Sequence, residues 1–186
     1  DQPGTTNCSK SKDSQGNPTN IGLFGDVVNS MPLLLSGNLD MNYQLLNAPE
    51  AGSYRTFIKE KQKRTAGAGT QVLLVGANDG MLHVLSDENG AEVAAFIPQV
   101  VLPNLKRLSN REYGNTTVDG DATSHRFFVD GKLLESDAYL NGAWTNVVLG
   151  STGAGGKSVF ALKFDAANPR SVTGSNLMWE INATTA

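Results

Sequence analysis

The glycine-rich segment Gly150–Ser158 holds the residue types of a phosphate-binding loop and ends in Gly-Lys-Ser. Such a loop needs a glycine, four residues and then Gly-Lys-Ser, and it opens a helix whose N-terminal amides face the phosphate. The first glycine would stand at position 151, which is Ser151, and Val159–Phe164 alternate as in a β-strand. We therefore interpret this segment as a connection between two strands and expect no nucleotide there.

Carboxylate side chains suggest two further kinds of chemistry. Asp119 and Asp121 have a spacing that occurs in calcium loops, but the alternating oxygen ligands and the closing Glu of such a loop are missing. Calcium and an ordinary turn therefore stay open there. Acid–base catalysis needs two carboxylates in one cleft. No spacing brings such a pair together, and we interpret these residues mostly as turn residues that bind their own backbone: Asp79, Asp87, Asp130 and Asp137.

Nucleophile and metal signals are sparse. Ser124-His125 has no recognisable acid partner, so we interpret His125 as packing at a strand end. A structural zinc site is not expected, because the ligand types are one cysteine, Cys8, and two separate histidines, His83 and His125. Cys8 is either an unpaired thiol or half of a disulfide whose partner lies outside this sequence. We assign no catalytic, cofactor-binding or metal-binding residue and expect no enzymatic activity.

The charge pattern argues against nucleic acid as a partner. The net charge is −3 and the isoelectric point is near 5.3, whereas phosphate binding requires clustered positive charge. One basic run, interrupted by Glu60, contains Lys59, Lys61, Lys63 and Arg64. We interpret this run as the solvated face of a helix, with Glu60 four residues before Arg64.

A repeated pattern of short strands carries the fold prediction. The turn Asn78-Asp79-Gly80 separates Gln71–Val75 from Met81–Leu85, which predicts a tight hairpin. The first copy continues with a third run, 92–97. A second copy lies roughly seventy to eighty residues downstream and consists of the runs 146–150, 158–164 and 177–181. Amphipathic spacing also predicts short helices over 53–64 and 98–113.

These elements predict an all-β fold, mainly antiparallel, with short helical insertions. Roughly eight or nine strands make about two blades of a β-propeller, and a closed ring needs about four to eight. Residues 1–20 are expected to be a flexible tail or an excised loop, and 21–186 an incomplete propeller fragment of a longer chain. Trp144 and Trp179 are expected to be core anchors between adjacent sheets. No apolar run is long enough to span a membrane, and no signal peptide is expected.

Several motifs in order resemble the propeller domain of the PilC/PilY family of type IV pilus tip-associated adhesins and biogenesis proteins. The resemblance covers roughly Gly25 to Glu180. Its motifs are the family's opening strand at Gly25–Pro32, the hairpin at Val75–His83, Ala95–Pro98 with Val101–Leu105, a Val-Asp-Gly strand at Phe128–Gly131, and the Gly-rich hairpin at Gly153–Gly156 closed by Trp179-Glu180.

The resemblance implies a role in pilus assembly, in opposing retraction and in attachment to surfaces or host cells. It implies pilin or minor pilin subunits, a host-cell or surface receptor and the remaining blades of the parent chain as partners. The location would be the bacterial cell surface, at the pilus tip or outer membrane, after export through the periplasm. Calcium would bind outside this fragment. Two alternatives are a quinone-dependent dehydrogenase and a periplasmic scaffold that binds polypeptide by strand addition.

Overall fold

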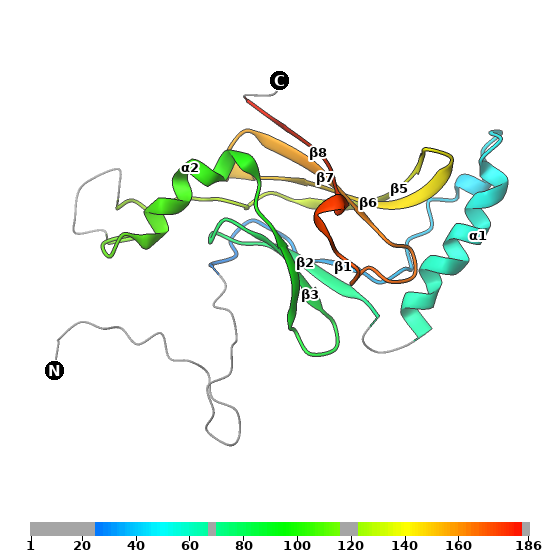
Figure 1. Cartoon of the computed structure of the whole chain (residues 1–186), viewed down its shortest axis with the longest axis horizontal. Coiled ribbons are helices and arrows are strands. Elements are labelled where there is room, and N and C mark those ends of the chain that lie inside the picture. Colours follow the sequence, from blue (N-terminus) through cyan, green and yellow to red (C-terminus); the bar gives the residue numbers. More distant parts are fainter. Residues whose placement is uncertain (1–24, 67–69, 116–122, 184–186) are drawn as a thin grey trace, which may run out of the picture.

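The chain forms two four-stranded antiparallel sheets in which the strands follow one another in chain order (Figure 1). The computed structural model describes residues 25–66, 70–115 and 123–183. Sheet 1 contains β1 (Leu33–Leu35), β2 (Val72–Gly76), β3 (Leu82–Ser86) and β4 (Glu92–Phe96). Sheet 2 contains β5 (Leu133–Leu140), β6 (Ala143–Ser151), β7 (Ser158–Phe164) and β8 (Leu177–Asn182). A four-stranded meander is the blade unit of a propeller, so the prediction of about two blades is confirmed.

Short helices connect and flank the sheets. The longest, α1 (Ala51–Gln62), continues into a 3₁₀ turn, η2 (Lys63–Ala66), and confirms the helix predicted over 53–64. The second predicted helix is three short pieces in succession: η3 (Gln99–Val101), α2 (Leu102–Leu105) and η4 (Lys106–Ser109). Single 3₁₀ turns occur at η1 (Tyr43–Leu45), η5 (Gly153–Gly155) and η6 (Gly174–Asn176).

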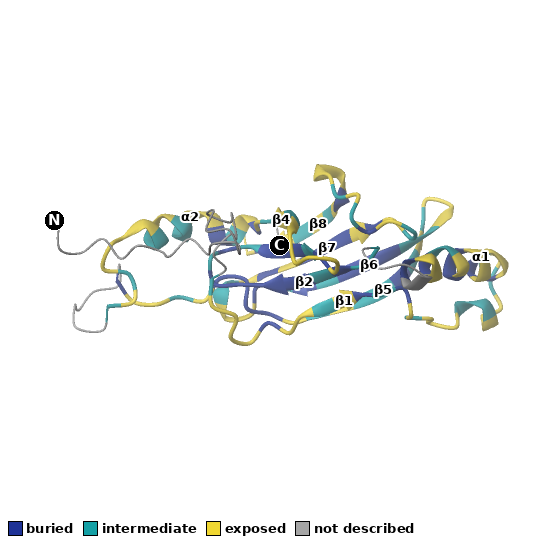
Figure 2. Ribbon diagram, turned by 90° about the horizontal axis from the view of Figure 1, so that it is seen from below, coloured by how far each residue is buried: buried dark blue, intermediate teal, exposed yellow. Residues whose placement is uncertain are grey.

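The core lies where the two sheets face each other. Leu74 pairs with Val84 in sheet 1, Val148 pairs with Leu162 in sheet 2, and all four side chains are buried in one apolar cluster. Side chains alternate between the two faces of a strand, so every second residue of β7 points into this cluster, beginning with Phe160. Figure 2 shows the buried residues concentrated along the facing strands. Each fully buried Val, Leu or Phe contributes about 1.5–3 kcal/mol to this packing.

The two sheets differ in length, and this difference places α1. Strands β2 and β3 have five residues each, whereas β5 has eight and β6 has nine. Sheet 1 therefore leaves one end of sheet 2 uncovered. Helix α1 packs beside that end (Figure 1). Its Tyr54, Phe57 and Ile58 form a second apolar cluster there with Trp144.

Two segments predicted as strands are not strands. Pro32 precedes β1 directly, and Gly25–Pro32 makes no ladder; within it the Ser30 hydroxyl accepts a hydrogen bond from the Gly76 amide at 2.9 Å. Segment Phe128–Gly131 crosses between the sheets. Its Val129 amide donates to the carbonyl of Ala77, which directly follows β2, and its Asp130 amide donates to the carbonyl of Thr152, which directly follows β6. Because successive amides bond to segments next to different sheets, no ladder forms.

Candidate functional site

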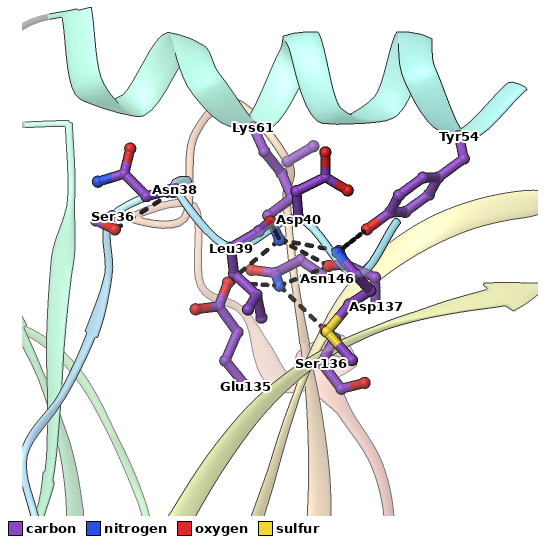
Figure 3. A network of polar contacts seen from close by, with 12 residues as sticks. Ser36, Asn38, Leu39, Asp40, Tyr54, Lys61, Glu135, Ser136, Asp137 and Asn146 are labelled. Atoms are coloured by element: carbon purple, nitrogen blue, oxygen red, sulfur yellow. Dashed lines mark hydrogen bonds and ion pairs between the residues drawn. The ribbon is translucent and has the colours of Figure 1, made fainter. Parts of the chain in front are cut away.

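A buried cluster of charged and polar side chains lies between α1 and sheet 2 (Figure 3). Lys61 of α1 points at Asp137 of β5, and its Nζ lies 2.8 Å from Asp137 Oδ1 and 3.1 Å from Oδ2. Glu135 Oε1 lies 3.4 Å from the same nitrogen, and the Leu39 carbonyl accepts from it at 3.0 Å. The side chains of Lys61 and Asp137 are both fully buried.

Hydrogen bonds hold the Asp137 carboxylate in one orientation. The Tyr54 hydroxyl donates to Oδ2 at 2.7 Å, and Asn146 Nδ2 donates to Oδ1 at 3.1 Å and to Glu135 Oε1 at 2.9 Å. Burial, and then the bond to Asp137, raise the pKa of Tyr54 well above its usual range, so this phenol stays a donor. Glu135, Asp137 and Asn146 come from the inward face of β5 and β6 because Asp137 pairs with Asn146 in register.

Arg64 lies next to this cluster and is also completely buried. Its guanidinium donates to Asn146 Oδ1 at 2.9 Å and to the carbonyls of Asp165 and Ala166 at 2.6 Å each. Burial lowers the pKa of Arg64, while the charges of nearby carboxylates oppose this shift. Arg64 therefore joins the end of α1 to β6 and to the connection that follows β7.

The interpretation of the basic run as a solvated face was wrong for two of its four residues. Lys59 and Lys63 are exposed, but Lys61 and Arg64 have no exposed surface. Glu60 pairs with Lys63 at 2.5 Å instead of with Arg64. Lys61 and Arg64 are three residues apart and so share one face of the helix, and that face meets carboxylate and carbonyl groups of sheet 2.

Asp137 was also misinterpreted, since it is a strand residue that binds side chains from α1. Asp130 is not a turn residue that binds its own backbone either: its Oδ1 accepts from the Asn29 amide at 2.9 Å and its Oδ2 from Asn29 Nδ2 at 2.5 Å. Asp87 accepts from the Gln71 amide at 3.1 Å and from Arg170 at 2.8 Å. Only Asp79 binds its own turn, through the Met81 amide at 3.1 Å.

Asp79 also takes part in an ionic contact across the predicted hairpin. His83 of β3 lies between two carboxylates: Nε2 is 2.9 Å from Asp79 Oδ2, and Nδ1 is 2.5 Å from Glu92 Oε2. Burial by itself would lower the pKa of His83, but the bonds to Asp79 and Glu92 outweigh it and raise the pKa. Burial likewise opposes the charge on Asp79, and the bonds from His83 and the Gly25 amide lower its pKa overall.

The other predicted histidine site is a loop contact. His125 lies in no strand, so its assignment to strand-end packing was wrong. Its Nε2 is 3.2 Å from Asp26 Oδ2, and its ring meets Phe127 edge to face. Asp26 also accepts from Asn78 Nδ2 at 3.1 Å.

The glycine-rich segment is a connection between β6 and β7, as predicted. No helix follows it, because β7 begins at Ser158. Gly155 is required for packing: a Cβ there would collide with the carbonyl of Phe128. The Thr152 hydroxyl turns inward and donates to the Gly156 carbonyl at 2.6 Å. The glycines of this segment therefore allow its backbone to approach the backbone of Phe128 closely.

Neither tryptophan lies between the sheets, so that expectation was wrong. Trp144 packs under α1, where its indole N–H donates to the Glu50 carbonyl at 3.1 Å and its ring lies 4.6 Å from that of Tyr54. Trp179 is 40% exposed on the face of sheet 2 that points away from sheet 1.

That outward face of sheet 2 is apolar, and no element among the described residues covers it; we call it the outer face. Leu149, Ala161 and Trp179 lie side by side across β6, β7 and β8 in register, and Val159 pairs with Ile181. The exposed apolar side chains of the outer face are Leu134 (61%), Val159 (45%), Trp179 (40%) and Ile181 (49%). Contiguous apolar patches of this kind mark surfaces that another element covers.

Sequence reasoning missed both the buried cluster and the outer face as units. The cluster had a weak signal in the alternation Glu135-Ser136-Asp137, which places two carboxylates on one strand face. Asp119, Asp121, Cys8 and the proposed tail 1–20 lie outside the described residues. Within the described ranges, no three His, Cys, Asp or Glu side chains are grouped to hold a metal ion, and no helix has the length and apolar character to cross a membrane.

Comparison with known proteins identifies the family. The PilY1 beta-propeller domain family matches residues 24–185. The chain is 39% identical over 166 residues to a Type IV pilus biogenesis factor PilY1 homolog of Xylella fastidiosa (strain Temecula1), covering 88% of this chain and 10% of that protein. It is 36% identical over 173 residues to the Type IV pilus biogenesis factor PilY1 of Pseudomonas aeruginosa (strain PAK), covering 92% and 13%.

A solved structure agrees with this. The crystal structure of the Pseudomonas aeruginosa PilY1 C-terminal domain superposes with a TM-score of 0.51 at 32% identity, covering 81% of this chain and 25% of that chain. The chain thus spans about a tenth of the length of the curated relatives it matches. Its two four-stranded meanders, its ordered motifs and these matches together place the chain in the PilY1 beta-propeller domain family.

Proposed function

We propose that this chain is a non-enzymatic propeller segment of a type IV pilus biogenesis factor that supports pilus assembly, opposes retraction and aids attachment to surfaces. The observation that carries the proposal is the match to PilY1 proteins over 88–92% of the chain at 36–39% identity. The two sheets support it physically, because rigid blades display loops on a fixed frame and such loops bind partners.

The state of the polar side chains supports a role without catalysis. Asp137 is saturated by Lys61, Tyr54 and Asn146, and Asp79 is held by His83 and two backbone amides. A carboxylate whose oxygens are all engaged by fixed protein donors has no oxygen free to act as a general base, since such a base must reach the proton of a bound substrate. Bound quinone absorbance or alcohol oxidation by the purified chain would favour the dehydrogenase alternative instead.

The exposed apolar side chains of the outer face suggest which partners contact which surface of this chain. We propose that the remaining blades of the longer protein cover it, because propeller blades pack face to face and Leu134, Val159, Trp179 and Ile181 offer a matching apolar surface. Pilin or minor pilin subunits and a surface or host-cell receptor would then contact the loops. The protein would act at the bacterial cell surface, at the pilus tip or outer membrane, after export through the periplasm.

Deletion of this segment from the parent gene tests the proposal. We expect loss of surface pili, measured by shearing and immunoblotting for pilin, and co-purification of pilin or minor pilins with the intact protein. A strain that also lacks the retraction motor separates the two roles: pili that reappear there indicate opposition to retraction, and pili that stay absent indicate assembly. Unchanged pili and attachment in both strains would contradict the proposal.

A further inference from the structure

The contact between Lys61 and Asp137 has the chemistry of a bond that is ready to form. The ammonium nitrogen lies 2.8 Å and 3.1 Å from the two oxygens of one carboxyl group (Figure 3), which brings it within contact distance of the carboxyl carbon that joins them. Separations of about 3–3.5 Å between reacting atoms are typical of near-attack geometry. Both side chains are fully buried, which removes the bulk water that would favour separate ions.

We propose that Lys61 and Asp137 join through an intramolecular amide bond, an isopeptide cross-link between α1 and β5. The overall reaction balances without any added reagent: one ammonium and one carboxylate give one amide and one water. The N–C bond forms between Lys61 Nζ and the Asp137 carboxyl carbon, and one C–O bond of Asp137 breaks. Two protons of the ammonium leave with the departing oxygen.

The neighbouring side chains supply what this reaction requires. Glu135 Oε1, 3.4 Å from Nζ, accepts a proton from the ammonium and so frees the nitrogen lone pair. The same proton then passes to Asp137 Oδ1, because only the neutral carboxyl group can accept a nucleophile. Asn146 Nδ2 bonds both Glu135 Oε1 and Asp137 Oδ1, so it holds the proton carrier beside the oxygen that departs as water. Tyr54 donates to Oδ2 at 2.7 Å and stabilises the negative charge that develops there as the nitrogen adds.

The product fits the same surroundings. The amide keeps one N–H, which matches the single Leu39 carbonyl that Lys61 Nζ already contacts at 3.0 Å. The remaining oxygen, Oδ2, keeps the hydrogen bond from Tyr54. A buried ion pair carries the cost of removing two charges from water, and the amide has no charge to desolvate. Burial at the same time withholds the water that hydrolysis would consume.

The aromatic surroundings also keep solvent away. Phe57 lies with its ring centroid 5.7 Å from Lys61 Nζ, and Tyr54 and Trp144 pack against each other beside it. The cross-link would tie together two positions 76 residues apart. The segment between them, which includes all of β2, β3 and β4, could then not extend under a pulling force.

The intact mass of the purified chain under denaturing conditions tests the proposal directly. We expect a mass about 18 Da below that of the sequence, the loss of one water. Digestion with trypsin should leave Lys61 uncleaved and yield one branched peptide that contains both Lys61 and Asp137. A mass equal to that of the sequence, after prolonged incubation of the folded protein, overturns the proposal.

Another reaction that loses one water would give the same mass deficit, so the experiment has to distinguish it from the isopeptide bond. An Asp-Gly pair can close to a succinimide, and Asp79-Gly80 and Asp130-Gly131 are such pairs. Tandem mass spectrometry locates the deficit, and mild alkali opens a succinimide but leaves an isopeptide intact. A deficit that maps to an Asp-Gly pair, or that alkali removes, counts against the cross-link.

Variants test the assigned roles. Lys61→Arg retains the charge but lacks the amine nucleophile and should show the full sequence mass, whereas Lys63→Arg, on the exposed side of the helix, should keep the deficit. Asp137→Asn should lose ammonia, about 17 Da, in place of water. Glu135→Gln should slow the reaction strongly; an unchanged rate would remove Glu135 from the mechanism. The wild-type mass decides the main point even where a variant fails to fold.

Discussion

The Arg64 guanidinium and the Asn146 amide meet in the interior, with Nη1 2.9 Å from Oδ1, although 82 positions separate them in the chain. Asn146 uses its Nδ2 for Glu135, Asp137 and the Ser136 carbonyl, so one amide group connects the basic face of α1 to the acidic face of β5. The position of α1 on sheet 2 is thus fixed by directional bonds in addition to apolar packing.

Replacing Arg64 by Met should destabilise the chain strongly. The change leaves Asn146 Oδ1 and the carbonyls of Asp165 and Ala166 without their donor, and unsatisfied buried acceptors cost about 1–3 kcal/mol each. We expect a loss of about 3 kcal/mol or more, measured by urea denaturation. Arg55→Met, at an exposed position of α1, should stay within about 0.5 kcal/mol of wild type. Equal midpoints for the two variants would contradict the assignment.

Gly80→Val should destabilise the hairpin through both strain and collision. Gly80 has φ +97°, which a β-branched residue rarely adopts, and a Cβ there would collide with Leu105 Cδ2. The strain alone should cost about 1 kcal/mol or more. Gly90→Val is the matched control, because Gly90 has φ +70° but open space around it. Thermal melting should place Gly80→Val below Gly90→Val and both below wild type; a Gly80→Val that melts like wild type would refute the hairpin assignment.

Local signals were enough to predict β2, β3 and β4 of sheet 1 and β6, β7 and β8 of sheet 2. The turn at Asn78–Gly80 determines its own geometry, because Gly80 supplies the positive φ and Asp79 binds the Met81 amide. The runs around Gly150–Ser158 alternate clearly enough to exclude a helix after the glycines. Strand β5 was not identified, because its inward positions include Glu135 and Asp137 and so do not show an apolar alternation.

The buried cluster could not be predicted for a related reason. Helical spacing places Lys61 on the face of Tyr54 and Phe57, and Arg64 three residues further along that face. Their basic side chains nevertheless led to their assignment to the solvent. Their burial depends on Asp137 and Asn146, which lie 76 and 82 positions away and become neighbours only after sheet 2 has formed. Trp144 was misassigned for the same reason, since its partner surface belongs to α1 and not to sheet 1.

The outer face should make the isolated chain associate with itself. Val159 and Ile181 pair across β7 and β8 and are 45% and 49% exposed. The double change Val159→Thr with Ile181→Thr keeps β-branched shape but adds hydroxyls, and it should weaken self-association roughly tenfold, which corresponds to about 1.4 kcal/mol. Sedimentation velocity over a concentration series measures this, and the melting temperature should not fall.

Leu45→Thr provides the control for this experiment, since Leu45 is 77% exposed but lies in η1, away from the outer face. It should leave self-association unchanged. If Leu45→Thr weakens association as much as the double variant does, the contact surface is elsewhere.

Stability should depend on pH through His83 and Asp79. The folded pKa of His83 is raised above its ordinary value of 6.5, so its contribution is fully present below pH 6.5 and is lost as pH rises through the folded pKa. The folded pKa of Asp79 is lowered below 3.8, so its contribution is present above pH 3.8 and is lost as pH falls through the folded pKa. The pair therefore stabilises the chain most between these two ordinary values.

The melting temperature should be higher at about pH 5.5 than at about pH 8.5. In a chain of this size, each kcal/mol of unfolding free energy corresponds to about 2–4 °C in the melting temperature. His83→Gln should remove most of this difference, because glutamine keeps hydrogen-bonding capacity but cannot carry the charge. His125→Gln should preserve the difference, since its contact with Asp26 is largely exposed and contributes little. A His83→Gln profile that matches wild type would show that this ionic contact does not contribute to folding.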